Sequence, residues 1–268
     1  MSQPAGRFAR ATAVHSIENN RFDGAIAEGW DIAGNANGGY LMSLAAGAMR
    51  EHCGRPDPVT ITAHYLRPGQ AGPITIDCDT VKEGKAFATV RGSMTREGKP
   101  ILTLLGAFGT LATSGDQALR VDAQPPELPA VEQCAGRGDH DFAPALHSQV
   151  DMRLHPDDAG FLAGNPSGNA QMRGWFRLKD DEPMDTIALL LALDAFPPTV
   201  FNARLPVAWT PTVELTAHLR ARPQPGWLRA RFTTRFVTGG FLEEDGELWD
   251  SSGHLVAQSR QLALVPKG

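Results

Sequence analysis

The chain has 268 residues, enough for one large domain or two of medium size with a substantial hydrophobic core. Its hydrophobic fraction of 42% and charged fraction of 21% are ordinary for a globular protein, and the net charge of −5 argues against nucleic acid as a partner. No signal-peptide core and no run long enough for a membrane span is found, so we expect a cytoplasmic protein with no membrane partner.

The first predicted helix is the stretch GGYLMSLAAGAMREH, residues 38–52. It is uncharged over most of its surface, which indicates that other elements wrap around it. Small side chains in its middle, such as Ser43 and Ala46, allow it to lie close against a sheet. Residues 59–108 follow as antiparallel strands, because segments such as ITIDCDTV alternate between apolar and polar positions.

Residues 113–145 are polar and contain Pro125, Pro126 and Pro129, which predicts a linker. We therefore expect an N-terminal unit over residues 1–112 and a C-terminal unit over residues 146–268.

The second predicted helix contains one residue that fits its surroundings badly. Asp185 can cap the helix start, and the stretch from Ile187 to Phe196 is apolar at every position except Asp194. We expect the prolines at 197 and 198 to end the helix. Asp194 would then place a carboxylate near a helix C-terminus, where the helix dipole disfavours negative charge, inside an apolar segment.

The strands after this helix repeat those of the first half. The tripeptide Thr62-Ala63-His64 recurs as Thr216-Ala217-His218, an offset of 154 residues. The turn glycines Gly84 and Gly98 match Gly239 and Gly253, each with an offset of 155 residues. The repeat predicts an α+β protein of two fused units, each a curled antiparallel sheet around a helix.

Four segments carry a family resemblance: NGGYLMSLAA, TAHYLRPG, EGKAFATVRGSMTREGKPI and LVAQSRQLAL. They resemble the acyl-CoA thioesterase II (TesB-like) family over residues 25–112 and 170–265. The resemblance implies a double hotdog fold, two tandem hotdog repeats each with a central helix wrapped by an antiparallel sheet. It implies that the protein is an acyl-CoA thioesterase, an enzyme that hydrolyses acyl-CoA thioesters to a free carboxylic acid and coenzyme A.

The resemblance also implies a catalytic set. Asp194 matches the family's helix acid, Thr212 its strand hydroxyl and Gln261 its amide, although Thr210 and Thr216 lie close enough to compete for the hydroxyl role. A desolvated carboxylate that stays ionised is a stronger base than one in water. We expect donation from Thr212 and Gln261 to keep Asp194 charged and to fix a water that attacks the thioester.

Backbone N–H groups at the start of the first helix, at Gly38, Gly39 and Tyr40, would bind the substrate oxygen by analogy with the fold. The acid run Glu243-Glu244-Asp245 is interpreted as a solvated strand or turn.

No cofactor and no metal is expected. The cysteines, at 53, 78 and 134, are few and far apart, and His140, His147 and His155 lack the spacing of metal ligands. Two other functions stay open, a non-catalytic acyl-thioester-binding protein and an enoyl-thioester hydratase, although Asp57 and His64 are too far apart for the hydratase pattern. We also expect a homo-oligomer, a dimer or a tetramer.

Overall fold

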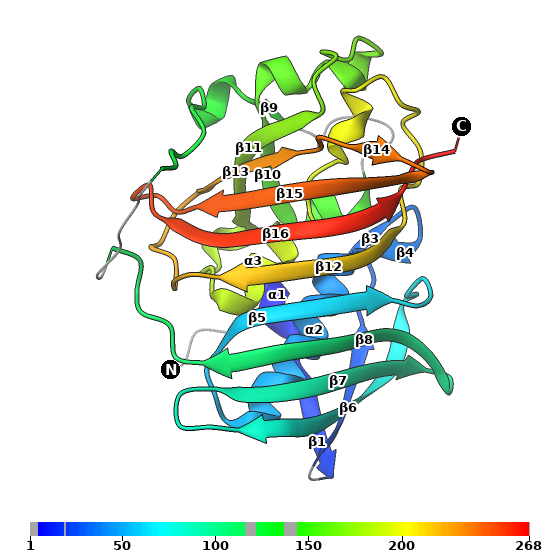
Figure 1. Ribbon diagram of the computed structural model, residues 1–268, viewed down its shortest axis with the longest axis vertical. Helices are drawn as coiled ribbons and strands as arrows, with labels where there is room; N and C mark the ends of the chain where they lie inside the picture. Colours follow the sequence, from blue (N-terminus) through cyan, green and yellow to red (C-terminus); the bar gives the residue numbers. More distant parts are fainter. Residues whose placement is uncertain (1–4, 19, 116–121, 137–143, 268) are drawn as a thin grey trace.

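The computed structural model describes residues 5–18, 20–115, 122–136 and 144–267. Across these residues, fourteen strands pair into one curved sheet whose strand-to-strand pairings are antiparallel (Figure 1). The first half supplies β1 (Val14–Glu18), β2 (Arg21–Ile26), β5 (Asp57–Tyr65), β6 (Gly72–Glu83), β7 (Ala88–Arg96) and β8 (Lys99–Gly109). The second half supplies β9 (Ala135–Gly136), β10 (Val150–Leu154), β11 (Gln171–Leu178), β12 (Thr212–Leu219), β13 (Leu228–Thr233), β14 (Val237–Thr238), β15 (Phe241–Trp249) and β16 (Leu255–Leu264).

The strand order is β1-β2-β6-β7-β8-β5-β12-β16-β15-β13-β11-β10-β9, with β14 paired to β15. The two halves therefore meet where β5 pairs with β12. At this seam Thr62 lies directly opposite Thr216, and their Oγ1 atoms are 2.9 Å apart. The two copies of the repeated tripeptide are thus neighbours across a local twofold axis, and the fused pair of units predicted from the repeat is present.

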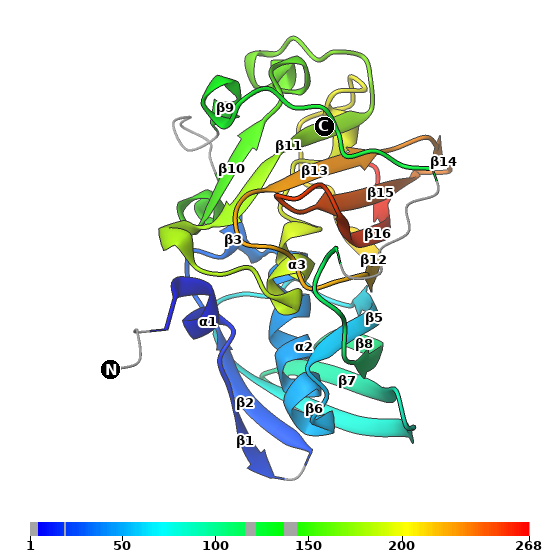
Figure 2. The ribbon, with the colours of Figure 1, turned by 90° about the vertical axis from the view of Figure 1, so that its left-hand side faces the viewer.

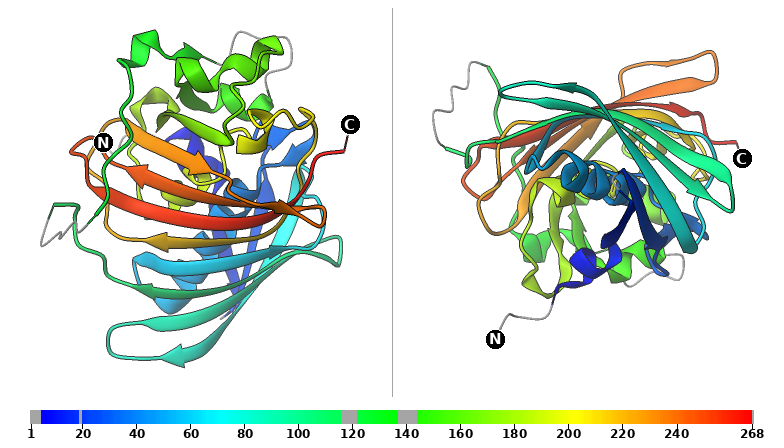
Figure 3. Two further views of the ribbon diagram at one scale, coloured as in Figure 1. Left: turned by 45° about the horizontal axis from the view of Figure 1, so that its top comes forward. Right: turned by 90° about the horizontal axis from the view of Figure 1, so that it is seen from below.

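The helices α1 (Arg7–Ala11), α2 (Gly38–Cys53) and α3 (Thr186–Ala192) lie on the concave side of this sheet (Figures 2 and 3). A small hairpin of β3 (Asp31–Ile32) and β4 (Asn35–Ala36) precedes α2. Short 3-10 helices span Val131–Gln133, Ala145–Ser148, Pro156–Asp158, Gly160–Ala163, Lys179–Asp181 and Thr199–Phe201. No helix among the described residues is long and apolar enough to cross a membrane.

The boundaries of α2 follow from capping. The side chain of Asn37 accepts a hydrogen bond from the Tyr40 N–H at the start of the helix. The helix ends at Gly54, whose φ of 63° is the left-handed conformation that glycine adopts without strain.

The second helix, α3, is shorter than predicted. Asp185 caps it as expected, by accepting a hydrogen bond from the Ala188 N–H. The helix ends at Ala192, five residues before Pro197, so the prediction that the prolines terminate it is wrong. Asp194 lies just beyond the helix, and its carboxylate binds the first turn of α2.

The two central helices run antiparallel and touch closely. A Cβ atom on Gly39 would lie 2.6 Å from the Leu190 carbonyl oxygen, so only glycine fits there. The Ser43 hydroxyl donates across the same interface to the Ile187 carbonyl oxygen at 3.1 Å. The start of α2 therefore lies against the end of α3.

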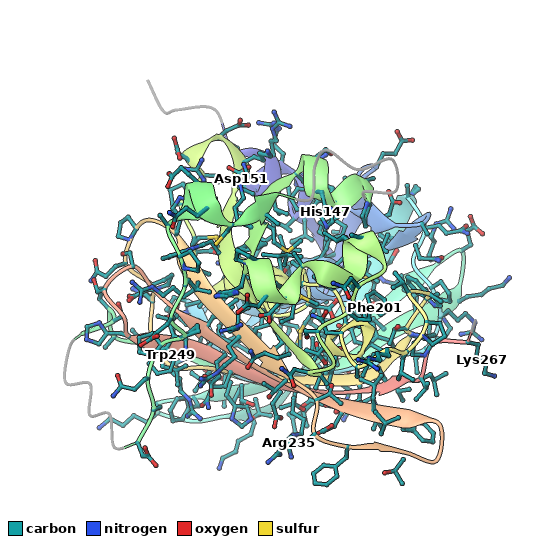
Figure 4. All side chains as sticks on the ribbon, turned by 90° about the horizontal axis from the view of Figure 1, so that it is seen from above. His147, Asp151, Phe201, Arg235, Trp249 and Lys267 are labelled. Carbon is teal, nitrogen blue, oxygen red and sulfur yellow. The ribbon has the colours of Figure 1, made fainter. Side chains whose placement is uncertain are left out.

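Part of the segment expected as a linker is built into the C-terminal half. β9 pairs with β10, with Gly136 opposite Arg153, and the Trp175 indole N–H donates to the Pro129 carbonyl oxygen at 2.9 Å. Residues 116–121 and 137–143 of that segment lie outside the described residues. Figure 4, seen from above, shows His147 and Phe201, both buried, on the short helices that cover this end of the molecule.

A buried carboxylate fastens the two halves together. Asp57, at the start of β5, accepts hydrogen bonds from the Arg222 guanidinium (2.7 Å at the shortest), the Thr186 hydroxyl (3.0 Å) and the Leu111 N–H (2.9 Å). Arg222 and Thr186 belong to the second half, so Asp57 is a polar link between the repeats.

Candidate active site

A cavity of about 310 Å³ opens where the start of α2, the segment after α3 and the adjoining ends of β12, β15 and β16 meet. The three residues predicted to be catalytic, Asp194, Thr212 and Gln261, all line it. Thr212 and Gln261 come from the neighbouring strands β12 and β16, so sheet pairing rather than proximity in sequence brings them together.

The carboxylate of Asp194 lies at the N-terminus of α2. Its Oδ2 accepts hydrogen bonds from the Gly39 N–H at 2.9 Å and from the Asn37 amide at 3.0 Å. The same Asn37 amide donates to the Asp194 carbonyl oxygen at 2.7 Å. The dipole of α2 therefore favours the charge that the dipole of α3 opposes, which explains the acid in an apolar segment.

The hydrogen bonds from Gly39 and Asn37 both fall on Oδ2, which leaves Oδ1 as the less engaged carboxylate oxygen of Asp194. Burial raises the pKa of Asp194 to about 6, while the hydrogen bonds from Gly39, Gly38 and Asn37 oppose that rise. The group is thus ionised at neutral pH, a stronger base than an exposed aspartate, and has one oxygen available to take a proton.

Thr212 is the one of the three candidate threonines that contacts Gln261. Its hydroxyl donates to Gln261 Oε1 at 3.1 Å. Thr210 also lines the cavity but donates to the Ala208 carbonyl oxygen, and Thr216 pairs with Thr62 at the seam. The expectation that Thr212 and Gln261 donate to Asp194 is not met by the hydrogen bonds among the described residues, because the hydroxyl hydrogen of Thr212 is directed to the Gln261 amide oxygen and the Gln261 amide nitrogen donates to Glu244.

Sequence reasoning missed a second buried acid in the cavity, Glu244. Its Oε1 accepts from Gln261 Nε2 at 3.1 Å and its Oε2 accepts from the Thr199 N–H at 2.8 Å. Glu244 is only 6% exposed, and burial, together with the charge of Asp194, raises its pKa to about 7. The interpretation of residues 243–245 as a solvated run is therefore wrong at this position.

A signal for Glu244 was present in the sequence. Leu242, Gly246 and Leu248 alternate with polar residues along β15 and are buried, so period-two alternation places Glu244 on the same inward face. The neighbouring Glu243 and Asp245 point the other way. Glu243 forms an ion pair with Arg235 at 3.6 Å, and Asp245 forms one with Arg260 at 2.6 Å.

Of the three residues expected to bind the substrate oxygen, Gly38 lies at the cavity and the other two donate their N–H groups elsewhere. Gly38 lines the cavity. The Gly39 N–H donates to Asp194, and the Tyr40 N–H donates to Asn37 Oδ1 at 2.9 Å. The Tyr40 side chain is fully buried and its hydroxyl donates to the Ala11 carbonyl oxygen. The N–H groups of Gly39 and Tyr40 are thus occupied by side chains of the protein itself.

In the part of the chain that the structure describes, no three His, Cys, Asp or Glu side chains gather in an arrangement that could hold a metal ion. His140, one of the three histidines considered from sequence, lies outside the described residues.

Comparison with known proteins places the chain in a family. The acyl-CoA thioesterase N-terminal domain matches residues 26–109, and the acyl-CoA thioesterase C-terminal domain matches residues 122–265. The crystal structure of a candidate thioesterase II from Thermobifida fusca YX is 34% identical, with a TM-score of 0.89 and 99% of each chain covered. A hot dog fold protein from Alicyclobacillus acidocaldarius is 21% identical, with a TM-score of 0.86 over 99% of this chain and 100% of that chain.

An uncharacterised protein from Mycobacterium tuberculosis is 28% identical over 267 residues, which cover 91% of each chain. These matches confirm both the double hotdog fold and the resemblance seen in the sequence. The chain belongs to the acyl-CoA thioesterase family.

Proposed function

We propose that the protein hydrolyses acyl-CoA thioesters to a free carboxylic acid and coenzyme A. One observation carries this proposal: the buried carboxylate of Asp194 lines a cavity, with its Asn37 and Gly39 hydrogen bonds on Oδ2, together with the hydrogen-bonded pair Thr212 and Gln261. A buried base next to a hydroxyl and an amide is suited to activating a water molecule.

In the proposed reaction, a water molecule binds between Asp194 Oδ1 and Thr212 Oγ1. Asp194 takes a proton from the water as its oxygen forms a bond to the thioester carbonyl carbon. The tetrahedral intermediate then collapses, the carbon–sulfur bond breaks, and the thiolate of coenzyme A leaves with the electron pair. The proton on Asp194 returns to solvent or to the departing sulfur.

The developing negative charge on the carbonyl oxygen needs a hydrogen-bond donor. The N–H groups of Gly39 and Tyr40 bind Asp194 and Asn37, and the Gly38 backbone also hydrogen-bonds to Asp194, so we assign this role to Gln261. One Nε2 hydrogen of Gln261 is used by Glu244, and the described residues offer no acceptor for the other. Gln261 lines the cavity and can present that hydrogen to the substrate.

Release of free thiol from a panel of acyl-CoAs, followed with a thiol reagent, tests the activity. Hydrolysis produces one thiol per thioester, whereas a hydratase acting on an enoyl-CoA or a non-catalytic binding protein produces none. The absence of thiol release from short-, medium- and long-chain acyl-CoAs would contradict the proposal.

Three further expectations stay predictions: a cytoplasmic location, assembly into a homodimer or homotetramer, and unit boundaries at residues 112 and 146.

A further inference from the structure

Three side chains on adjacent strands form a continuous hydrogen-bond chain beside the cavity. Thr212 on β12 donates to Gln261 on β16, and Gln261 donates to Glu244 on β15, which lies directly opposite it in the sheet. We propose that Glu244 is a positioning residue for thioester hydrolysis, whose ionised carboxylate sets the direction of this chain so that Thr212 accepts a hydrogen bond from the attacking water. The inference rests on the proposed function.

The direction of the chain follows from the hydrogen-bonding capacity of a carboxylate. An ionised carboxylate accepts hydrogen bonds and cannot donate them. Both oxygens of Glu244 are occupied by donors, the Thr199 backbone N–H and the Gln261 amide. Gln261 must therefore turn its nitrogen towards Glu244 and its oxygen towards Thr212. Thr212 then donates its only hydroxyl hydrogen to Gln261, so its oxygen can only accept hydrogen bonds from the cavity.

This arrangement orients the nucleophile. A water that donates one hydrogen to Asp194 Oδ1 and the other to Thr212 Oγ1 keeps a lone pair directed at the thioester carbon. If the chain ran in the opposite direction, the Thr212 hydroxyl would donate to the water and occupy the lone pair that must attack. Glu244 thus acts through Gln261 and Thr212 and does not touch the substrate.

Protonation of Glu244 would reverse the chain, because a protonated carboxyl can donate to Gln261 Oε1. The other titratable groups that line the cavity within the described residues are Asp194, Tyr65 and Arg67. Of these, Asp194 is the one whose charge acts on Glu244, and it adds to the effect of burial in raising the pKa of Glu244 to about 7. The favourable direction therefore holds above neutral pH and is lost below it.

The test is the substitution Glu244→Gln, which keeps the shape and removes the charge. The Thr199 N–H will bind the oxygen of the new amide, so the amide nitrogen must face Gln261 and reverse the chain. We expect kcat for acyl-CoA hydrolysis to fall by about tenfold or more with little change in KM, a typical effect for disturbing general-base catalysis. The pH of half-maximal kcat should move from near 7 towards 6, because only Asp194 then titrates.

The matched control is Glu243→Gln, the same chemical change at the preceding residue. The Glu243 carboxylate binds the backbone N–H groups of Arg235 and Phe236 outside the cavity. Figure 4 shows Arg235 in the view from above, and its side chain is 60% exposed. We expect this variant to keep the kcat and the pH profile of the wild type.

The outcomes separate the inference from the function. Wild-type activity with an unchanged kcat and pH profile in Glu244→Gln would overturn the role of Glu244 and leave hydrolysis intact. No thiol release from the wild type would contradict the proposed function itself. If Glu244→Gln does not fold, the pH dependence of kcat in the wild type provides the test. A loss of kcat at acid pH that requires two ionisations supports the inference, whereas a loss that a single ionisation describes overturns it.

Discussion

The carboxylate of Asp194 accepts a hydrogen bond at 2.9 Å from the backbone N–H of Gly39, although 155 residues separate them in the chain. This bond joins the end of the helix in one repeat to the start of the helix in the other. The candidate base is therefore held by backbone from the opposite half, and its position depends on how closely the two helices pack.

Asp194→Asn should reduce kcat by on the order of a hundredfold or more, the usual scale for losing a general base. The asparagine oxygen can still accept from the Gly39 N–H, so we expect the fold to survive. Steady-state thiol release gives the rate, and circular dichroism with thermal unfolding checks the structure. A well-folded Asp194→Asn protein with near wild-type turnover would show that the base lies elsewhere.

Activity and stability should respond to pH in opposite directions. Burial raises the pKa values of Asp194, to about 6, and Glu244, to about 7, above those of the unfolded chain, so between pH 8 and pH 6 the folded state binds more protons. The free energy of unfolding should therefore rise by about 1–2 kcal/mol as the pH is lowered over this range, while kcat falls.

Urea unfolding at pH 6 and pH 8 measures this trend. The double variant Asp194→Asn/Glu244→Gln serves as the control. It cannot take up either proton, so its free energy of unfolding should not show this rise between pH 8 and pH 6. Equal pH dependence of stability in the wild type and the double variant would contradict the assignment of the two raised pKa values.

Gly39→Ala should destabilise the protein by about 1–3 kcal/mol, as overpacking of a tight contact does. The added Cβ would lie 2.6 Å from the Leu190 carbonyl oxygen and 2.9 Å from Asp194 Cβ, both of which are held in place by the fold. Activity should fall as well, because Asp194 is displaced.

Gly47→Ala, on the same helix, is the matched comparison. The nearest atom to its added Cβ is the Thr12 carbonyl oxygen at 3.7 Å, an ordinary contact. Alanine also favours the helix over glycine by about 0.5–1 kcal/mol. Chemical denaturation should thus show that Gly39→Ala lowers the free energy of unfolding and that Gly47→Ala raises it. A decrease for Gly47→Ala as large as that for Gly39→Ala would refute the packing argument.

Asp57→Asn should destabilise the protein by about 2–3 kcal/mol at pH 7, because it removes the charge that Arg222 pairs with. Although burial opposes it, the hydrogen bonds from Arg222, Leu111 and Thr186 hold the pKa of Asp57 below its usual value. The ionised group thus contributes stability above the unfolded pKa near 3.8, and this contribution is lost as the pH falls through the lower folded pKa.

The difference in the free energy of unfolding between the wild type and Asp57→Asn, measured from pH 7 down to pH 3, should therefore shrink at acid pH. Asp79→Asn, at an exposed position of β6, should match the wild type throughout. A difference in stability between the wild type and Asp57→Asn that stays constant with pH would show that the ion pair does not cause it.

Local periodicity and the internal repeat were sufficient to predict most of the fold. Alternation identified β6, and the recurrence of Thr62-Ala63-His64 at Thr216 indicated two related units. The sequence could not indicate that these two tripeptides pair with each other, because pairing between distant strands depends on tertiary packing rather than local propensity. The same holds for β9, which is too short to leave a pattern.

The candidate site was predicted in part. Asp194 was conspicuous because its charge conflicts with its apolar neighbours, whereas Glu244 was missed because the acids on both sides of it obscured the alternation along β15. The direction of the Thr212 hydrogen bond could not be predicted either. It depends on a third residue across the sheet, and such a chain of contacts has no signature in a single sequence.

The twofold axis through Thr62 and Thr216 relates two junctions between the central helices, and they are chemically unlike. At the second junction the end of α2 supplies Arg50, which pairs with Asp185 at 3.1 Å, and the carboxylate of Glu182 binds the backbone N–H groups of Phe8 and Ala9 in α1. The buried carboxylate at this second junction, Asp57, is paired with Arg222 at 2.7 Å, whereas Asp194 lines a cavity. On the proposed function we therefore expect one reaction centre within the described part of each polypeptide, so a tight-binding inhibitor should bind with a stoichiometry of one per chain rather than two.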